Sequence, residues 1–411
     1  MQNGDTSSAT AGRAVRFDTA AASSTRGRNG TEAARGATSA RRAVRIGTAS
    51  TAAATSSTRG AVRNGTAGAA AASSSVQRAV RIGTASTTSA TSSTRGVVRN
   101  DTAAAAAHQP EIDLSEDEVL CMGLEFVGFT KKRQKVKASR NTERFRGNYG
   151  VSPLTVSKLI RDLQTLLDEE HRIKKLNLNY LFLTLHWLKA YPTYIQLEGP
   201  WNVCPETIGA TVKLYTKAIQ RLKEHKIKWF EEGEIDEDEI NLITVDGVHC
   251  RTFEVRKDPS TKWYSHKSHS AGLAYELAIA IRSDRLVWMN GPFCASKSDL
   301  TIFRFGDGDK ANPGQNLRDK IPEGKRAITD SGYDGEDGKT CSVTRKSDSA
   351  DVKDFKARAK SRQETFNSRV KAFNCTAVSF RHGQEIHAAA FESVCILLQY
   401  DMESGHGLFE V

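Results

Sequence analysis

The sequence predicts an α/β protein with a mixed sheet and flanking helices, preceded by an all-α region and an N-terminal tail. Three observations lead to this fold class. The composition changes after residue 108, apolar residues recur at helical spacing from 141 to 230, and strand-like runs follow the acidic stretch at 231–240. Strands followed by a helix, another strand and a final helix form an α/β order.

Residues 1–108 consist mainly of Ala, Ser, Thr, Gly and Arg and contain imperfect repeats, including "RAVRIGTAS" at 42 and again at 78. They hold 14 Arg, no Lys and four acids, a formal charge of +10, whereas residues 109–411 carry only +1. The repeats offer too little apolar surface to stack as a solenoid, so we expect a disordered basic tail. An Arg-rich, acid-poor N-terminus is also typical of an organelle transit peptide.

The charge of residues 109–411 does not by itself indicate nucleic-acid binding, because that inference needs basic residues clustered on one face. The seven Cys residues form no CxxC pair, so neither a disulfide framework nor a zinc ribbon is expected. The richest apolar run, at 178–188, is broken by polar residues and is too short to span a membrane. We therefore expect a soluble protein of a reducing compartment.

Residues 109–140 combine an acidic helix with a basic linker. The stretch 111–126 predicts a short helix, for which Ser115 is a candidate cap. The run "KKRQKVK" at 131–137 is typical of a nuclear import signal or a strip of phosphate contacts, and equally of a solvated linker.

Residues 141–232 predict helices and contain an internal echo. "YGVSPLTVSKLI" at 149–160 and "WNVCPETIGATV" at 201–212 each place Pro at the first position of an expected helix, where a missing N–H costs nothing. A short helix, a tight turn and a capped second helix is the layout of a DNA-binding helix-turn-helix, with Thr207 as a candidate DNA contact. The alternative is an ordinary helical bundle.

Residues 241–411 predict the sheet. Strand-like runs are "LITVDGVH", "KWYSHKSHSAGLAYELAIAI", "DRLVWMNGPF" and "KRAITDSGY", a capped helix starts in "SKSDLTIFRFG", and helices return from 350. Asp246 and Asp330 each close an apolar run and precede a Gly by one or two residues. A strand-end Asp before Gly is often only a turn former.

Glu364 lies in a predicted helix whose buried face is marked by Phe366, Val370 and Phe373. Taken singly, a helical Glu is usually solvated. Three carboxylates from two strand ends and one helix can nevertheless converge on Mg²⁺, which prefers oxygen ligands. Two such ions support in-line cleavage of a phosphodiester.

The residues around these acids resemble a known family. "VDGVHC", "TDSGYDG" and "RQETFNSRVKAF" are similar to the three blocks of the DDE transposase domain of PIF/Harbinger-type elements and their bacterial insertion-sequence relatives. The resemblance runs from about residue 145 to the C-terminus. It implies an RNase H-like fold in which Asp246, Asp330 and Glu364 are catalytic and bind two Mg²⁺ or Mn²⁺ ions.

The resemblance also assigns roles to neighbouring residues. Asp299 matches a recurring Asp before a helix, as an accessory residue or a helix cap, although Ser298 replaces the His that many relatives have there. Arg362, Asn367 and Lys371 would face the DNA backbone, the alternative being an exposed helix surface.

The implied function is that of a nuclear DDE transposase-like endonuclease, which cuts DNA and joins 3′ ends to target DNA. Implied partners are double-stranded DNA, a second copy of the chain and a Myb-like helper, with no membrane. One alternative is a domesticated, non-catalytic factor that binds DNA or protein. Another is a structure-specific nuclease on the same fold.

Overall fold

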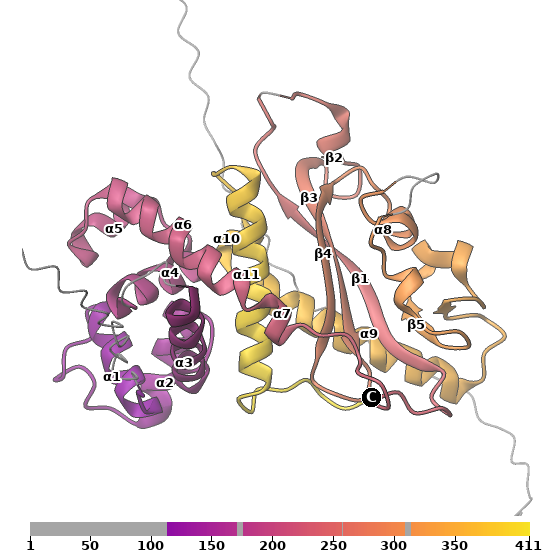
Figure 1. Cartoon of the computed structure of the whole chain (residues 1–411), viewed down its shortest axis with the longest axis horizontal. Helices are drawn as coiled ribbons and strands as arrows, with labels where there is room; N and C mark the ends of the chain where they lie inside the picture. Colours follow the sequence, from indigo (N-terminus) through magenta and orange to yellow (C-terminus); the bar gives the residue numbers. More distant parts are fainter. Residues whose placement is uncertain (1–112, 171–175, 257, 309–313) are drawn as a thin grey trace, which may run out of the picture. The chain divides into compact units, whose positions relative to one another are not determined.

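The structure, a computed structural model, describes residues 113–170, 176–256, 258–308 and 314–411 (Figure 1). The predicted disordered tail at 1–108 lies outside the described residues. Within the described part, no helix is long and apolar enough to cross a membrane. All seven Cys residues lie in the described part and are free thiols.

Helices occupy the chain from 116 to 226, before the sheet. They are α1 (Glu116–Phe126), α2 (Ala138–Tyr149), α3 (Pro153–Glu170), α4 (Leu178–Ala190), α5 (Tyr194–Trp201), α6 (Pro205–Arg221) and α7 (Lys223–Lys226). The Ser115 hydroxyl accepts from the N–H of Glu118, whose carboxylate accepts from Ser115, so the predicted cap forms a capping box. The two helices predicted to open at Pro153 and Pro205 both begin there.

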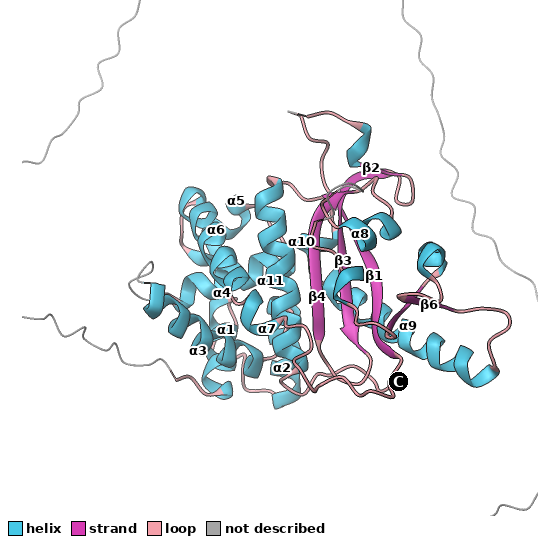
Figure 2. Cartoon of the chain, turned by 45° about the vertical axis from the view of Figure 1, so that its right-hand side comes forward, coloured by secondary structure: helices cyan, strands magenta, loops and turns pink. Residues whose placement is uncertain are grey.

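The sheet mixes antiparallel and parallel strands (Figure 2). The strands are β1 (Asn241–Arg251), β2 (Tyr264–Ser265), β3 (Ser270–Ala280), β4 (Leu286–Cys294), β5 (Arg326–Thr329) and β6 (Cys341–Val343). β3 runs antiparallel to β1, β2 and β4, whereas β1, β5 and β6 run parallel, giving the order β4-β3-β1-β5-β6. The predicted mixed sheet is therefore confirmed, but the run predicted as one strand at 262–281 forms two, β2 and β3, and the short β6 was not expected.

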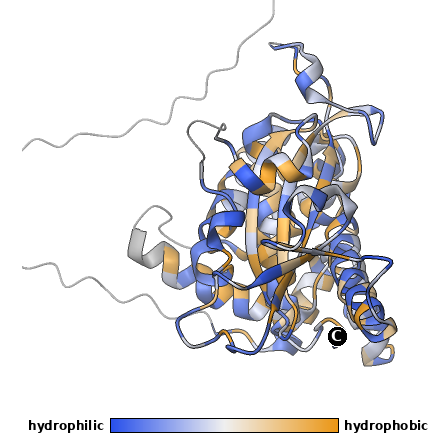
Figure 3. Cartoon of the chain, turned by 90° about the vertical axis from the view of Figure 1, so that its right-hand side faces the viewer, coloured by the Kyte–Doolittle hydropathy of each residue, from blue (hydrophilic) through white to orange (hydrophobic). Residues whose placement is uncertain are grey.

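Helices flank this sheet. α8 (Asp299–Phe305) follows β4, and α9 (Ala350–Lys371), α10 (Asn374–Ala377) and α11 (Gln384–Met402) follow β6. Short 3₁₀ turns η1 (Thr261–Trp263), η2 (Arg318–Lys320) and η3 (Ser331–Glu336) complete the described elements. Figure 3 shows hydrophobic residues concentrated on the strands and hydrophilic residues on many of the surrounding loops.

α11 joins the helical region to the sheet. Its residues from Ala389 to Met402 are all buried, including the polar residues Glu392, Gln399 and Asp401, which hydrogen-bond to neighbouring elements. Ser393 donates to the carbonyl of Thr216 in α6, while Phe391 stacks on Tyr275 of β3 with ring centroids 3.6 Å apart. One cluster of buried side chains runs from α1 through the sheet to α11. The boundary predicted between 232 and 241 thus separates types of secondary structure within one packed unit.

Candidate active site

Asp246 lies inside β1, not at its end. The strand continues for five residues to Arg251 and keeps its antiparallel pairing with β3 throughout. The expectation that Asp246 closes its strand is therefore wrong. What ends near Asp246 is the parallel half of the sheet, because the last pair between β1 and β5 is Thr244 with Ile328.

Asp330 comes directly after β5 and keeps an extended backbone. Continuing the β1–β5 register by two residues places Asp330 beside Asp246 on neighbouring strands, which lie about 4.8 Å apart in a sheet. The Asp330 carboxylate accepts the N–H of Gly332 at 2.8 Å and caps the η3 turn. The sequence correctly predicts that this Asp follows a strand, and its side chain is exposed.

A chain of hydrogen bonds between β1 and α9 fixes the orientation of Asp246. The Thr244 hydroxyl donates to Gln363 Oε1 at 2.8 Å, and Gln363 Nε2 donates to Asn367 Oδ1 at 3.2 Å. Asn367 Nδ2 then donates to Asp246 Oδ2 at 2.7 Å. Because both amides use their oxygen as acceptor and their nitrogen as donor, each has one orientation in this chain. Asn367 is buried and therefore serves the carboxylate, which corrects the expected position at the DNA backbone.

Glu364 lies on α9 one turn before Asn367, and its side chain is exposed. Burial, together with the charges of Glu364 and Asp299, raises the pKa of Asp246 to about 7. These charge effects weaken with distance, so they identify Glu364 and Asp299 as neighbours of Asp246. The buried face predicted for α9 is confirmed at Phe366, Val370 and Phe373.

Asp299 reaches the site from the opposite face of the sheet. Side chains alternate along a strand, so Thr244 and Asp246 face α9 while Gly247 faces α8. A Cβ atom on Gly247 would lie 2.3 Å from Asp299 Oδ1, so only glycine leaves room for this carboxylate. The cap of α8 is Ser298, which accepts the N–H of Thr301. Asp299 itself is thus directed to the site.

None of these four carboxylates forms an ion pair with a Lys or Arg of the described residues. Burial and the charge of Asp330 raise the pKa of Asp299, whereas the charge of Lys267 lowers it. Lys267 is therefore a cation near the site. The turn that carries Lys267 folds over β1, since Ser268 Oγ lies 3.0 Å from His249 Nδ1. This contact could not be predicted from the sequence.

The donor set suits a hard divalent cation, because carboxylate oxygens without a cationic partner are the ligands that Mg²⁺ and Mn²⁺ prefer. In the part of the chain that the structure describes, no three His, Cys, Asp or Glu side chains are grouped closely enough to hold an ion. Asp246 is held by Asn367, whereas Asp330 and Glu364 are exposed. Closing the group therefore requires rotation of those two side chains about their single bonds.

A further acid under the site escaped sequence reasoning. Glu276 is directly opposite Gly247 in the β1–β3 register and is only 1% exposed. Its Oε2 accepts from Trp288 Nε1 at 2.9 Å, while its Oε1 and the nearby buried hydroxyl of Tyr333 have no hydrogen-bond partner among the described residues. Burial raises the pKa of Glu276 to about 8, the Trp288 bond lowers it, and the Asp299 charge raises it. Because Glu276 lies within an apolar run, the sequence does not mark it as a site residue.

Glu276→Gln should change how stability depends on pH. The folded pKa lies above the unfolded value, so the wild-type side chain contributes stability below pH 4.5 that is lost as pH rises toward 8. The loss is about 1.4 kcal/mol per pH unit between the two pKa values. Urea unfolding at pH 5 to 8 measures this effect. We expect the unfolding free energy of the wild type, minus that of the variant, to fall as the pH rises. Parallel curves would contradict a neutral Glu276.

Arg362 and Lys371 hold the fold together, which corrects their expected position toward DNA. Arg362 is 4% exposed and donates to Asp284 Oδ1 at 2.7 Å and to the carbonyls of Ser283 and Phe409. Lys371 donates to the carbonyls of His249 and Thr376. Both side chains lie on the packed side of α9, where backbone acceptors replace water.

Arg362→Met should destabilise the protein by about 3 kcal/mol, because it leaves buried carbonyls and Asp284 without their donor. Urea unfolding measures the change. Arg358→Met is the matched control: it lies on the same helix and is exposed, so we expect a cost within about 1 kcal/mol. Equal effects of the two substitutions would show that the buried contacts of Arg362 carry no special weight.

Of the two helix-turn-helix echoes, only the second leaves a free surface. α3 is largely buried in its described side chains, whereas α6 exposes a strip that contains Lys213, Leu214 and Lys217. Thr207 lies in the first turn of α6, half-buried, with Oγ1 3.1 Å from the sulfur of Cys204. Its predicted contact with DNA stays a prediction.

Comparison of the chain with protein-family models, with curated proteins and with solved structures finds no match in any of the three.

Proposed function

We propose that this protein is a metal-dependent DNA endonuclease of the DDE transposase type. The observation that carries the proposal is that Glu364 and Asp299 lie near enough to Asp246 for their charges to act on it, while the strand register places Asp330 beside Asp246 where the parallel pairing ends. The charges of Glu364 and Asp299 raise the pKa of Asp246, and the charge of Asp330 raises the pKa of Asp299, so the two buried carboxylates are ionised only at a cost to folding. Sites that bear such a cost are typically functional.

Asp246, Asp330 and Glu364 would hold two Mg²⁺ or Mn²⁺ ions, which activate a water or a 3′-hydroxyl and stabilise the leaving oxygen of a phosphodiester. Asn367 keeps Asp246 oriented through its amide, so this carboxylate is preorganised. Asp299 lies close against Gly247 and adds negative charge on the other face. Lys267 offers an exposed ammonium for the phosphate of a bound strand.

The fold supports the same proposal. The order β4-β3-β1-β5-β6, with three antiparallel strands beside two parallel ones, agrees with the RNase H-like fold that the sequence resemblance implies. The exposed strip of α6 and the basic stretch 131–137 are positively charged surfaces, as contact with duplex phosphates requires. We further propose that the protein acts in the nucleus, which the resemblance of the basic stretch 131–137 to an import signal supports.

The test is Mg²⁺-dependent cleavage by the full chain. Supercoiled plasmid is incubated with the protein and Mg²⁺ or Mn²⁺, and nicked and linear products are measured on a gel. We expect cleavage that EDTA abolishes and that Asp246→Asn removes. Cleavage that persists in EDTA, or in Asp246→Asn at the wild-type rate, would overturn the proposal.

Two outcomes distinguish the rival functions. Products joined to a labelled target duplex indicate transposition, whereas products that are only cut indicate a structure-specific nuclease. DNA binding without cleavage in either metal indicates a non-catalytic, domesticated factor. The absence of a closed metal-ligand group among the described residues makes this last comparison necessary.

A further inference from the structure

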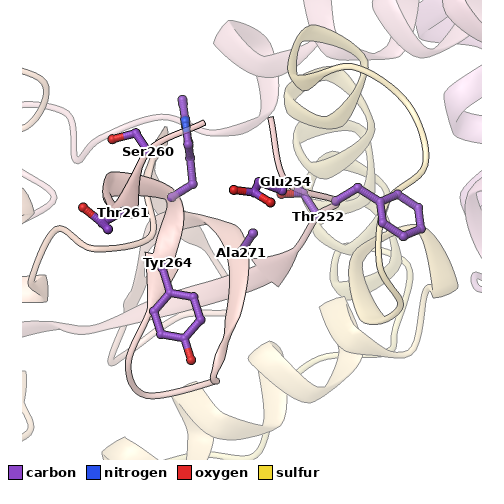
Figure 4. Close-up of a pocket in the computed structure, with 8 residues that line it drawn as sticks. Thr252, Glu254, Ser260, Thr261, Tyr264 and Ala271 are labelled. Carbon is purple, nitrogen blue, oxygen red and sulfur yellow. The ribbon is translucent and has the colours of Figure 1, made fainter. Parts of the chain in front are cut away.

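The connection between β1 and β3 is much longer than a hairpin needs. Residues 252–269 contain the η1 turn and the short strand β2, and a cleft of about 440 Å³ opens between the two limbs of the connection (Figure 4). In Figure 4, Ser260 and Thr261 lie on one side of the cleft and Thr252 and Glu254 on the other. Long connections with structure of their own are usually functional.

Aromatic side chains dominate the cleft. Phe253, Trp263 and Tyr264 line it, and Phe253 and Tyr264 are 63% and 39% exposed. Exposed aromatic rings carry no stability benefit of burial, so their grouping indicates a partner with a flat apolar face. Trp263 is held in place, since its Nε1 donates to the carbonyl of Asp258 at 3.0 Å and Lys262 lies over its ring.

The polar groups of the cleft and its surroundings restrict the identity of that partner. Thr252, Ser260 and Thr261 offer hydroxyls that both donate and accept, and Glu254 offers an acceptor for an amino group. The described residues of the surrounding stretch 251–269 include four Lys or Arg and two acids, and one of these acids, Asp258, is ion-paired with Lys262. A ligand with a flat ring, mixed donors and acceptors, and attached negative charge matches this combination.

We propose that this cleft binds an unpaired nucleobase of the DNA on which the carboxylate site acts. Aromatic side chains stack on bases whose faces are free, and basic neighbours hold the adjoining phosphates. β1 connects the two sites: six residues from Asp246 to Thr252 span about 20 Å, or about six base steps of duplex. The cleft would thus bind the DNA strand at a fixed distance from the cleaved phosphodiester.

This inference rests on the proposed DNA substrate but has its own test. Two short duplexes are compared by fluorescence titration without metal, one fully paired and one with a single 2-aminopurine bulge. We expect the full chain to bind the bulged duplex more tightly and to quench the bulge fluorescence through stacking. Phe253→Ala and Tyr264→Ala should each reduce the preference by about 5- to 150-fold.

Matched variants keep the test specific. Tyr264→Phe keeps the ring and should keep the preference, and Phe409→Ala removes an exposed ring outside the cleft and should change nothing. Equal affinity of the wild type for both duplexes, or an undiminished preference in both alanine variants, would overturn the inference. Plasmid cleavage by the same proteins distinguishes the two proposals. Cleavage without a preference for the bulged duplex refutes only nucleobase binding in the cleft. A preference without cleavage refutes only the nuclease activity.

Discussion

Glu364→Gln should reduce Mg²⁺-dependent DNA cleavage by on the order of 10³-fold or more, while DNA binding stays within about twofold of wild type. Glutamine keeps the size of the side chain and removes the charge that reaches Asp246 across the site. Because Glu364 is exposed and makes no ion pair with the described residues, its neutralisation should leave folding unchanged. Single-turnover cleavage and fluorescence anisotropy measure the two effects separately.

Asp354→Asn is the control for this substitution. Asp354 is also an exposed acid of α9, ten residues earlier and therefore about 15 Å along the helix. Its neutralisation changes the helix charge equally without touching the site, so cleavage should be unaffected. Wild-type cleavage by Glu364→Gln, or an equal loss in both variants, would remove Glu364 from the active site.

Gly247→Ala should reduce cleavage by about 10²-fold with little loss of stability. The added Cβ would lie 2.3 Å from Asp299 Oδ1 and must displace that carboxylate, and a displacement of about 1 Å in an active site can cost this much. β1 itself accepts alanine without strain, because Gly247 is not among the residues with positive φ. Gly147→Ala, at a helix position with open space, should leave cleavage unchanged.

A double-mutant cycle identifies the cause of the Gly247 effect. If alanine acts by displacing Asp299, then Gly247→Ala should cost nothing further in an Asp299→Ala background. Additive losses would show that Gly247 acts through another contact, such as the strand pairing with Glu276. Thermal unfolding of all four proteins checks that the comparison concerns intact folds.

Periodicity and helix-start signals predicted most of the fold. Ser115, Pro153 and Pro205 marked helix starts because capping and a fixed φ act locally. β6 was missed because three residues carry no periodic signal. The cluster of buried side chains that joins the helical region to the sheet was also missed, since packing of α11 between them depends on contacts remote in sequence.

The candidate site could be predicted only in part. Family-like motifs singled out Asp246, Asp330 and Glu364, but the role of Gly247 reversed once β1 was seen to continue beyond it. One sequence cannot distinguish a glycine that ends a strand from a glycine whose missing side chain leaves room for a neighbouring carboxylate. Arg362 was assigned to DNA because helical spacing does not reveal that backbone carbonyls of the β3–β4 turn lie against it.

The central claim is that Asp246, Asp330 and Glu364 meet around metal ions. The most direct measurement is a crystal structure of the protein soaked with Mn²⁺, in which anomalous scattering locates each ion. We predict one or two Mn²⁺ peaks bonded to oxygens of Asp246, with Asp330 and Glu364 turned inward to share them. A well-ordered site with the three carboxylates apart and no Mn²⁺ between them would contradict the account.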